Sequence, residues 1–443
     1  MHRLAFLLSV AFFSGCALAD TAWRGTSPQS LASGSGDISK AGGAAVTLSA
    51  ESTGANQFVG AITTIDAATF QGREVVLTGT LLVNSGTGNA ALWVRADGPE
   101  APLAFASTGD QPVRLNEGSQ PREARLYIPA AATSLKLGVT FGSAGRVDVE
   151  HLTLNAESAV QSNVSAYDML DTAISIIRAS ALNANRVDWK SEQKSLLTAD
   201  LKKLPAQEAY SRIQTVLTAL ADRHSSVQAP SAVSTYRAGA VATQAVEARS
   251  MQDIGYLLVP GLRGSDPKAG DIFSTQLCEH IAGLATTASR GWIIDLRDNT
   301  GGNMWPMIKG LRPLLGDADL GAFRDRNGVA TAWRAQPSKG CDVDLSHSSV
   351  AVLVGPRTAS SGEAVAVAFQ GRPGTSFFGQ PTAGLSTANQ SFSLPDGGAI
   401  ALTTAVFLDR TGVAYLQGIQ PEKPVPREQD AVAAAAAWLR TQP

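Results

Sequence analysis

The sequence is poor in charged residues, in cysteine and in long apolar runs. Of its 443 residues 17% are charged, and 36 Lys and Arg against 38 Asp and Glu leave a formal net charge of −2. Such a balance creates no global positive field, so we expect no nucleic-acid partner. No segment reaches the roughly 20 apolar residues of a transmembrane helix, which excludes an integral membrane protein. The 44% hydrophobic residues, 42 glycines and 21 prolines instead predict a compact, turn-rich globular protein of two or three domains.

Residues 1–19 have the pattern of a secretory signal peptide. Arg3 precedes an apolar run, and small residues end at Ala19 just before Asp20. We therefore expect an exported protein, periplasmic or extracellular, whose mature chain begins near Asp20. Cys16 leaves lipid anchoring open as an alternative, because it ends a short run that resembles a bacterial lipoprotein signal.

The two later cysteines are Cys278 and Cys341. An exported compartment allows them to pair, but the sequence gives no distance between them, so a disulfide and two free thiols both remain open. Two cysteines cannot by themselves complete a four-ligand zinc site. We expect no metal and no cofactor.

The residue pattern changes along the mature chain. Residues 20–156 are rich in Gly, Thr, Ser and Val, with short extended runs between turn clusters, which predicts an all-β sandwich. By fold-level analogy these runs resemble jelly-roll modules of the carbohydrate-binding kind. A glycan or protein ligand for this domain stays open. Trp93 could stack on a sugar, or it could be a core residue. Residues 157–230 place apolar side chains at helical spacing and predict a small helical subdomain.

The rest of the chain alternates strand-like with helical runs. After a linker-like stretch to about Arg249, this alternation over residues 231–428 predicts βαβ units with a largely parallel sheet. Residues 429–443 are expected to form a C-terminal helix.

A serine follows one of the predicted strands at a position suited to chemistry. The strand Val350–Val354 leads through a tight turn to Ser360, which would lie at the N-terminus of a helix. Free backbone N–H groups and the positive end of the helix dipole converge there. Ser360 could attack a carbonyl while the N–H of Ser361 receives the developing oxyanion. The alternative is an ordinary serine N-cap.

A glycine pair ends a second predicted strand. Gly301 or Gly302 could supply the second oxyanion donor, because a missing Cβ lets the backbone approach a ligand closely. The next three residues, Asn303, Met304 and Trp305, are expected to face the cleft and contact substrate. The alternative for Met304 and Trp305 is that they simply start a packed helix.

Two motifs together resemble those of the tail-specific, or C-terminal-processing, serine protease family, which includes the tricorn core and nisin-resistance branch. They read LRDNTGG at Leu296–Gly302 and TASSGE at Thr358–Glu363. The resemblance extends over residues from about 160 to 428. The chain between His224 and Ile254 is too short for the PDZ domain that many processing proteases carry there, so we expect none. It implies a ClpP/crotonase-like core, a peptide or protein substrate, and Ser360 as the nucleophile.

The general base departs from the Ser-Lys pattern of many members of this family. Leu385 stands where they carry the lysine, and it cannot accept a proton. The resemblance to the histidine-using branch implies His224 as the base, and an imidazole pKa near 6.5 suits that role. No residue identifies itself as the group that orients His224. Ser225, by resemblance to tricorn-type sites, or a carboxylate from elsewhere could do so.

Three further histidines compete for the role of base. His347 precedes the nucleophile strand and is expected to be structural, while His280 and His151 are expected to lie at the surface or in packing contacts.

The sequence thus predicts an exported serine-type peptidase with a Ser-His mechanism and a backbone oxyanion hole. Two alternatives stay open. One is a non-catalytic peptide- or ligand-binding protein on the same scaffold, and the other is an esterase.

Overall fold

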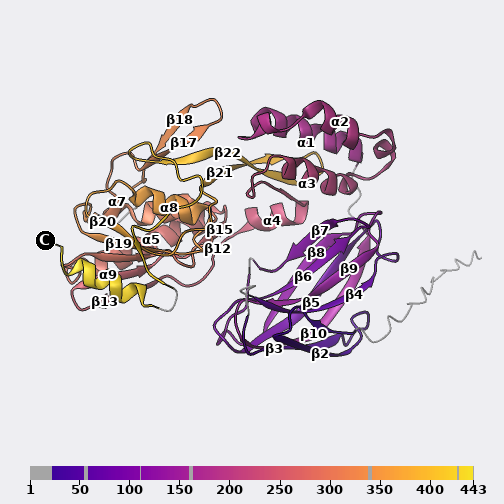
Figure 1. Cartoon of the computed structure of the whole chain (residues 1–443), viewed down its shortest axis with the longest axis horizontal. Coiled ribbons are helices and arrows are strands. Elements are labelled where there is room, and N and C mark those ends of the chain that lie inside the picture. Colours follow the sequence, from indigo (N-terminus) through magenta and orange to yellow (C-terminus); the bar gives the residue numbers. More distant parts are fainter. Residues whose placement is uncertain are drawn as a thin grey trace, which may run out of the picture. The chain divides into compact units, whose positions relative to one another are not determined.

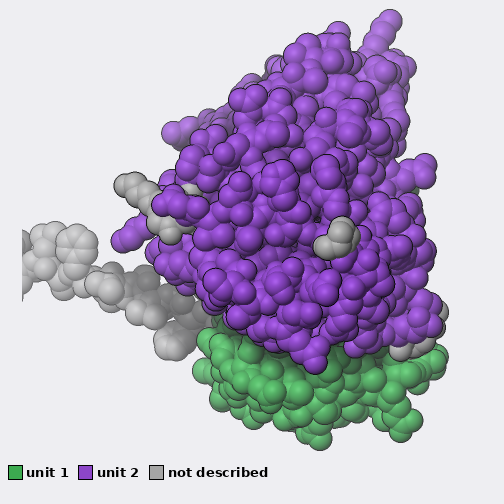
Figure 2. Space-filling view, turned by 90° about the vertical axis from the view of Figure 1, so that its left-hand side faces the viewer, with its two compact units in different colours: residues 1–161 green, residues 162–443 purple. Residues whose placement is uncertain are grey.

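The structure is a computed structural model that describes residues 22–53, 58–109, 111–158, 163–337, 342–426 and 429–442. The chain divides into two compact units, residues 1–161 and 162–443, which Figure 2 distinguishes by colour. The predicted signal peptide, Cys16 and Cys341 lie outside the described residues. Within the described residues, no helix combines the length and apolar character needed to cross a membrane.

The first unit contains two five-stranded antiparallel sheets (Figure 1). One has the order β1 (Arg24–Gly25), β4 (Val59–Asp66), β9 (Ser134–Phe141), β6 (Ala90–Asp97), β7 (Pro102–Ser107). The other has the order β2 (Ser30–Gly36), β3 (Ala44–Ala50), β10 (Gly145–Ser158), β5 (Arg73–Ser85), β8 (Gln120–Tyr127). The chain crosses from one sheet to the other at most of its turns.

The two sheets enclose one hydrophobic core. Leu48 and Leu77 of one sheet and Leu92 and Leu137 of the other belong to the same buried cluster. Alternation of apolar and polar residues along these strands directs one side-chain set inward, as the strand period of two requires. Trp93 is 8% exposed and its ring lies 6.3 Å from that of Phe105, so too little of its surface is open to stack on a sugar. This corrects the idea of an exposed Trp93.

The second unit is built on a six-stranded sheet. Its order is β13 (Glu247–Met251), β14 (Ile254–Leu258), β16 (Trp292–Asp295), β19 (Val350–Val354), β20 (Thr375–Gly379), β23 (Lys423–Pro424). All neighbours pair in parallel except β13 with β14. The carboxyl ends of β16 and β19 therefore lie at one edge, which is where ligand sites form in such sheets.

Helices cover both faces of this sheet (Figure 1). On one face a large buried cluster includes residues of α5 (Pro267–Leu284), α6 (Met304–Gly310), α7 (Arg312–Leu315) and α8 (Ser361–Phe369). On the other face α9 (Ala431–Leu439) packs in a separate cluster. Val352 of β19 points into the first cluster and Leu353 into the second. Burial on both faces explains why the central strands are uniformly apolar.

A helical layer and an antiparallel sheet complete the second unit. The helices are α1 (Ala166–Ser180), α2 (Trp189–Leu196) and α3 (Ala209–Ala219). The sheet joins β11 (Ser226–Gln228), β22 (Ala399–Asp409), β17 (Gly321–Asp325) and β18 (Ala330–Trp333), with β21 (Thr387–Ser393) also paired to β22. Ile213 of α3 shares a core with Ile400 and Leu402 of β22.

The prediction of a linker-like stretch up to about Arg249 is wrong. This region holds β11, α4 (Pro230–Ala238), β12 (Ala240–Ala242) and the edge strand β13. β12 pairs with β15 (Leu262–Gly264), and β13 pairs with β14. These segments are too short to show a clear apolar periodicity in the sequence. They form strands because they pair with neighbouring strands, β15 in one case and the strongly apolar β14 in the other.

Candidate active site

Ser360 stands in the turn between β19 and α8. Its backbone angles are φ 53° and ψ −120°, a left-handed conformation that non-glycine residues rarely adopt. Such strain costs on the order of 1–3 kcal/mol and persists only where the surroundings impose it. The Thr358 hydroxyl contributes, because it donates to Leu296 O at 2.8 Å and accepts from Gly355 N at 3.0 Å.

The fully buried Glu363 ties the Ser360 turn to the loop at residues 382–385. Its Oε2 accepts from Ser360 N at 3.1 Å and Leu385 N at 2.7 Å. Its Oε1 accepts from the Thr382 hydroxyl at 2.5 Å and Gly384 N at 3.0 Å. Four donors satisfy the buried carboxylate, as burial of a charge demands. Leu385, at the position of the family's lysine, therefore contributes its backbone N–H to this network.

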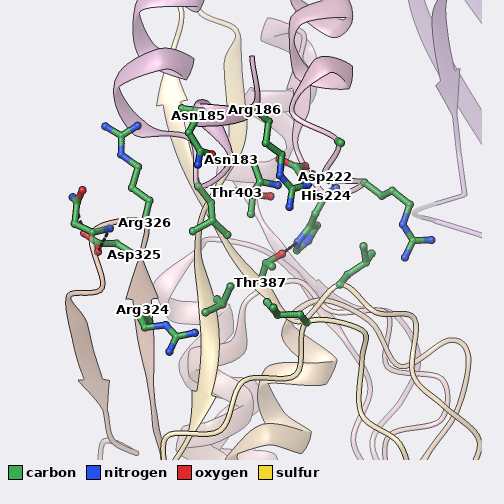
Figure 3. Close-up of a pocket in the computed structure, with 18 of the residues that line it drawn as sticks. Asn183, Asn185, Arg186, Asp222, His224, Arg324, Asp325, Arg326, Thr387 and Thr403 are labelled. Carbon is green, nitrogen blue, oxygen red and sulfur yellow. Dashed lines mark hydrogen bonds between the residues drawn. The ribbon is translucent and has the colours of Figure 1, made fainter. Parts of the chain in front are cut away.

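His224 brings an imidazole to the Ser360 hydroxyl. Nε2 lies 2.9 Å from Ser360 Oγ. Nδ1 lies 2.7 Å from the hydroxyl of Thr387, a contact that Figure 3 shows. If Nδ1 carries the proton and donates it to Thr387, Nε2 has a free lone pair for the serine proton. The site thus places a hydroxyl, rather than a carboxylate, behind the imidazole.

The loop that carries His224 is anchored by hydrogen bonds to its backbone. Asp222 Oδ1 accepts from the N–H groups of His224 at 3.0 Å and Ser225 at 2.7 Å. Asn389 Nδ2 donates to His224 O at 2.8 Å. The Ser225 hydroxyl donates to Asp222 and accepts from Thr403 N, so Ser225 holds the loop and does not contact the ring. Neither Ser225 nor a carboxylate occupies the predicted orienting position.

Burial lowers the pKa of His224 below its ordinary value of 6.5, and nearby Asp222 only partly opposes this shift. The lowered pKa keeps the ring neutral at pH 7. A neutral imidazole next to a hydroxyl is the state that can accept its proton.

The glycine loop after β16 lies against Ser360. Asn299 anchors it, since its Nδ2 donates to Val259 O at 3.1 Å and its backbone O accepts from Ala359 N at 3.0 Å. A Cβ added to Gly301 would come within 2.9 Å of the Ser360 Cβ. Only a residue without a side chain fits this contact.

The two glycine N–H groups are not equivalent. Gly301 N donates to Asn299 Oδ1 at 3.0 Å, so it is already engaged. The N–H groups of Gly302 and Ser361 have no intramolecular acceptor among the described residues. The Ser361 hydroxyl donates to Gly302 O at 2.6 Å and joins the two segments. Of the two glycines predicted as the second oxyanion donor, only Gly302 therefore remains a candidate.

The three residues after the glycine pair have different environments. Asn303 caps α6, accepting from Trp305 N at 3.2 Å. Met304 is 6% exposed and packs in the core, so the expectation that it faces substrate is corrected in favour of a packed helix start. Trp305 is 46% exposed and makes an edge contact with Phe323 at 6.1 Å between ring centroids.

None of the three competing histidines is in position to act as the base for Ser360 in the described structure. His347, His280 and His151 are exposed, and the described structure gives none of them a bond to Ser360. Cys278 is disulfide-bonded, whereas Cys341 lies outside the described residues. No group of three or more metal-ligating side chains occurs among the described residues.

Thr387 is the site residue that the sequence did not reveal. It starts β21 and reaches His224 across 163 positions of chain. A threonine in a polar strand is an ordinary β-former, so no local signal distinguishes it.

A serine at a strained strand-to-helix turn, within hydrogen-bonding reach of an imidazole, is the arrangement of enzymes that use a serine nucleophile. Residues 253–425 match the family model described as Peptidase family S41, and the chain contains a domain of this family. Its relatives include proteins named as carboxyl-terminal-processing proteases.

Three similarities illustrate the relationship. The chain is 32% identical over 196 residues to nisin-resistance protein of Lactococcus lactis subsp. lactis, covering 42% of this chain and 60% of the relative. It is 27% identical over 184 residues to the chloroplastic carboxyl-terminal-processing peptidase 2 of Arabidopsis thaliana, covering 38% and 34%. A lipoprotein structure from Streptococcus agalactiae matches with a TM-score of 0.56 at 25% identity, covering 64% of this chain and 99% of that one. The chain spans less than two thirds of the length of these two curated relatives.

Proposed function

We propose that the protein is an exported serine peptidase that hydrolyses peptide bonds with Ser360 as nucleophile and His224 as acid and base. The observation that carries the proposal is the 2.9 Å contact between Ser360 Oγ and His224 Nε2 at the strained turn before α8. The family of residues 253–425 supports the reaction class, and the names of the relatives support a peptide or protein substrate.

The proposed reaction proceeds through an acyl-enzyme. Ser360 Oγ attacks the substrate carbonyl carbon while His224 Nε2 takes the hydroxyl proton. The oxyanion that forms accepts from the N–H groups of Gly302 and Ser361. The tetrahedral intermediate then expels the amine, to which His224 returns the proton. A water molecule attacks the ester with His224 again as base, and Ser360 regains its proton as the acid product leaves.

The Thr387 hydroxyl is the proposed orienting group of His224. It holds Nδ1 at 2.7 Å and favours the tautomer that leaves Nε2 free. A neutral hydroxyl stabilises the imidazolium less than a carboxylate does. We therefore expect slower turnover than a Ser-His-Asp triad supports.

Two finer structural proposals accompany this function. The first unit is a jelly-roll-like sandwich, since between β3 and β10 the chain passes from one sheet to the other at every connection except that from β6 to β7. The second unit has a ClpP/crotonase-like core, in keeping with its parallel sheet and its helices on both faces.

Replacement of the nucleophile tests the proposed function. Ser360→Ala should lower kcat/KM on a susceptible peptide by about 10⁴-fold or more while the fold persists. Circular dichroism and the unfolding midpoint serve as folding controls. Unchanged turnover would remove Ser360 from the mechanism.

A phosphonate probe separates the alternatives. The wild-type protein should form a covalent adduct at Ser360, detected by mass spectrometry, and Ser360→Ala should form none. A non-catalytic binding protein would leave the probe unreacted. Comparing matched ester and amide substrates distinguishes a peptidase from an esterase, because an esterase would hydrolyse only the ester at a useful rate.

A further inference from the structure

A cavity of about 850 Å³ borders the imidazole of His224. Its walls come from the helical layer, the His224 loop, β17 with its turn, and the segment around residues 384–387. His224 and Thr387 both line it, so the cavity opens directly beside the site described above (Figure 3). The function proposed for Ser360 and His224 does not explain this space.

The cavity is unusually rich in arginine. Its lining includes five arginines, Arg178, Arg186, Arg223, Arg324 and Arg326, against two acidic residues, Asp222 and Asp325. The protein as a whole carries a net charge of −2, so this local excess of positive charge runs against the overall balance. Charges of one sign that line one cavity attract groups of the opposite charge, and salt screens this attraction because all of these arginines except Arg324 are exposed.

The two carboxylates in the lining are already engaged by their own loops. Asp222 accepts from the His224 and Ser225 N–H groups. Asp325 accepts from the N–H groups of Asn327 and Val329, each at 2.9 Å. Neither carboxylate forms an ion pair with an arginine of the cavity within the described residues.

The guanidinium groups have correspondingly few partners. Arg326 donates to Arg178 O at 3.0 Å, and Arg223 reaches Ala383 O at 3.5 Å. Arg186 and Arg324 have no side-chain hydrogen bond or ion pair among the described residues. Figure 3 shows Arg186 extending toward Asp222 and His224, and Arg324 projecting from β17. Planar forks of this kind bind carboxylates in bidentate fashion.

The position of His224 assigns the cavity to one side of the substrate. In the proposed reaction His224 gives its proton to the leaving amine, so the segment on the C-terminal side of the cleaved bond passes beside this ring. The cavity adjoins His224 and Thr387, whereas Ser360 and Gly302 are not among its lining residues. A chain leaving the site on the His224 side therefore meets the arginines.

We propose that this cavity is a substrate-binding site for acidic peptide segments, in which Arg186 and Arg324 bind Asp or Glu side chains on the C-terminal side of the scissile bond. The proposal rests on the proposed peptidase function for its direction along the substrate. The expected attraction between the arginines and acidic side chains follows from the lining of the cavity and does not depend on the peptidase function.

A pair of quenched fluorescent peptides tests the proposal in the full-length protein. One carries two Glu residues just after the cleavage site and the other carries Gln at the same positions, both with amidated C-termini so that no terminal carboxylate contributes. We expect kcat/KM to be on the order of tenfold higher for the Glu peptide at low salt, falling toward parity near 0.5 M NaCl. A third peptide carries Gln and a free C-terminus, and it tests whether a terminal carboxylate alone raises kcat/KM. Its kcat/KM should equal that of the amidated Gln peptide.

Variants assign the effect to the cavity. Arg186→Gln together with Arg324→Gln should remove the preference, so that kcat/KM of this variant is the same for the Glu and the Gln peptide within about twofold. Arg440→Gln is the matched control, because Arg440 lies at the end of α9 and contacts Gln252 rather than the cavity. It should leave the preference intact.

Binding to the Ser360→Ala protein separates this inference from the proposed function. Fluorescence anisotropy should show about tenfold tighter binding of the Glu peptide than of the Gln peptide, lost in the triple variant that adds both arginine substitutions. Equal binding and equal kcat/KM of the two peptides would overturn the inference and leave the peptidase intact. A preference only for Glu placed before the cleavage site would overturn it too. Full turnover by Ser360→Ala would overturn the peptidase proposal alone.

Discussion

At the scale of single residues, the site is made of side chains whose environments differ sharply from their usual ones. Ser360 has a left-handed backbone, and burial lowers the pKa of His224. Thr387 takes the position at Nδ1 that a carboxylate holds in the Ser-His-Asp triad. Each departure favours proton transfer from the serine to a neutral ring.

The lowered pKa of His224 predicts the acid limb of activity. Catalysis requires the neutral ring, so kcat/KM should fall as the pH drops through the pKa of His224 in the free protein. Because burial places this pKa below 6.5, the protein should retain more than half of its plateau activity at pH 6.5. A pH profile of kcat/KM measures the midpoint. A midpoint at or above pH 6.5 would contradict the prediction.

Thr387 should act through His224 rather than on the substrate. Thr387→Val removes the acceptor of the Nδ1 proton and should lower kcat by roughly tenfold to a hundredfold. The acid limb should also move to lower pH, since the imidazolium loses a stabilising acceptor. Thr387→Ser keeps the hydroxyl and should retain most of the activity. An unshifted pH profile in Thr387→Val would show that the residue only packs.

At the scale of elements, the strand-turn-helix unit β19–α8 is held from both of its sides. Glu363 connects it to the loop at residues 382–385, and Asn299 connects it to the glycine loop after β16. The buried Arg372, just after α8, donates to carbonyls of two preceding segments, at Leu314 O (2.7 Å) and in the loop that ends at Ser348 O (2.7 Å). The Ser360 turn is therefore set by contacts with several neighbouring elements.

Loss of Arg372 should destabilise the second unit. Arg372→Met would leave several buried carbonyls without a donor, at a cost of about 2–4 kcal/mol in the free energy of unfolding. Burial lowers the pKa of Arg372 to about 10, so the group stays charged and bonded at pH 7. Urea denaturation at pH 7 measures the effect, with Arg440→Gln as an exposed control. A change below 0.5 kcal/mol, on the order of that for surface substitutions, would contradict the prediction.

At the scale of the whole molecule, each compact unit has its own core. One cluster holds the buried residues of the two antiparallel sheets, and the other clusters belong to residues 162–443. All residues of the proposed site and of the arginine cavity belong to the second unit. A unit with its own core can in principle fold alone.

Residues 162–443 produced alone should therefore fold and react. We expect a cooperative unfolding transition and kcat/KM on a short peptide within about threefold of the full chain, because the described contacts of the site lie within this unit. The isolated first unit, residues 22–161, provides the complementary sample and should show neither cleavage nor reaction with the phosphonate. An unfolded or inert second unit would contradict the prediction.

The sequence by itself determined those features that depend on local pattern. The apolar strand Val350–Val354, the helix after Ser360 and the glycine pair after β16 are present as predicted, because side-chain periodicity and backbone freedom act over a few residues. It failed for the region before Arg249, where short strands owe their formation to partners elsewhere.

Tertiary structure alone decided which distant groups meet. His224 and Ser360 are 136 positions apart and His224 and Thr387 are 163 apart, yet each pair is within hydrogen-bonding distance. The choice of Gly302 over Gly301, the burial of Met304 and the gathering of five arginines beside His224 likewise depend on the packing of separate elements. These contacts form only when the whole unit has packed, because they join residues from separate elements. No local sequence motif therefore predicts them.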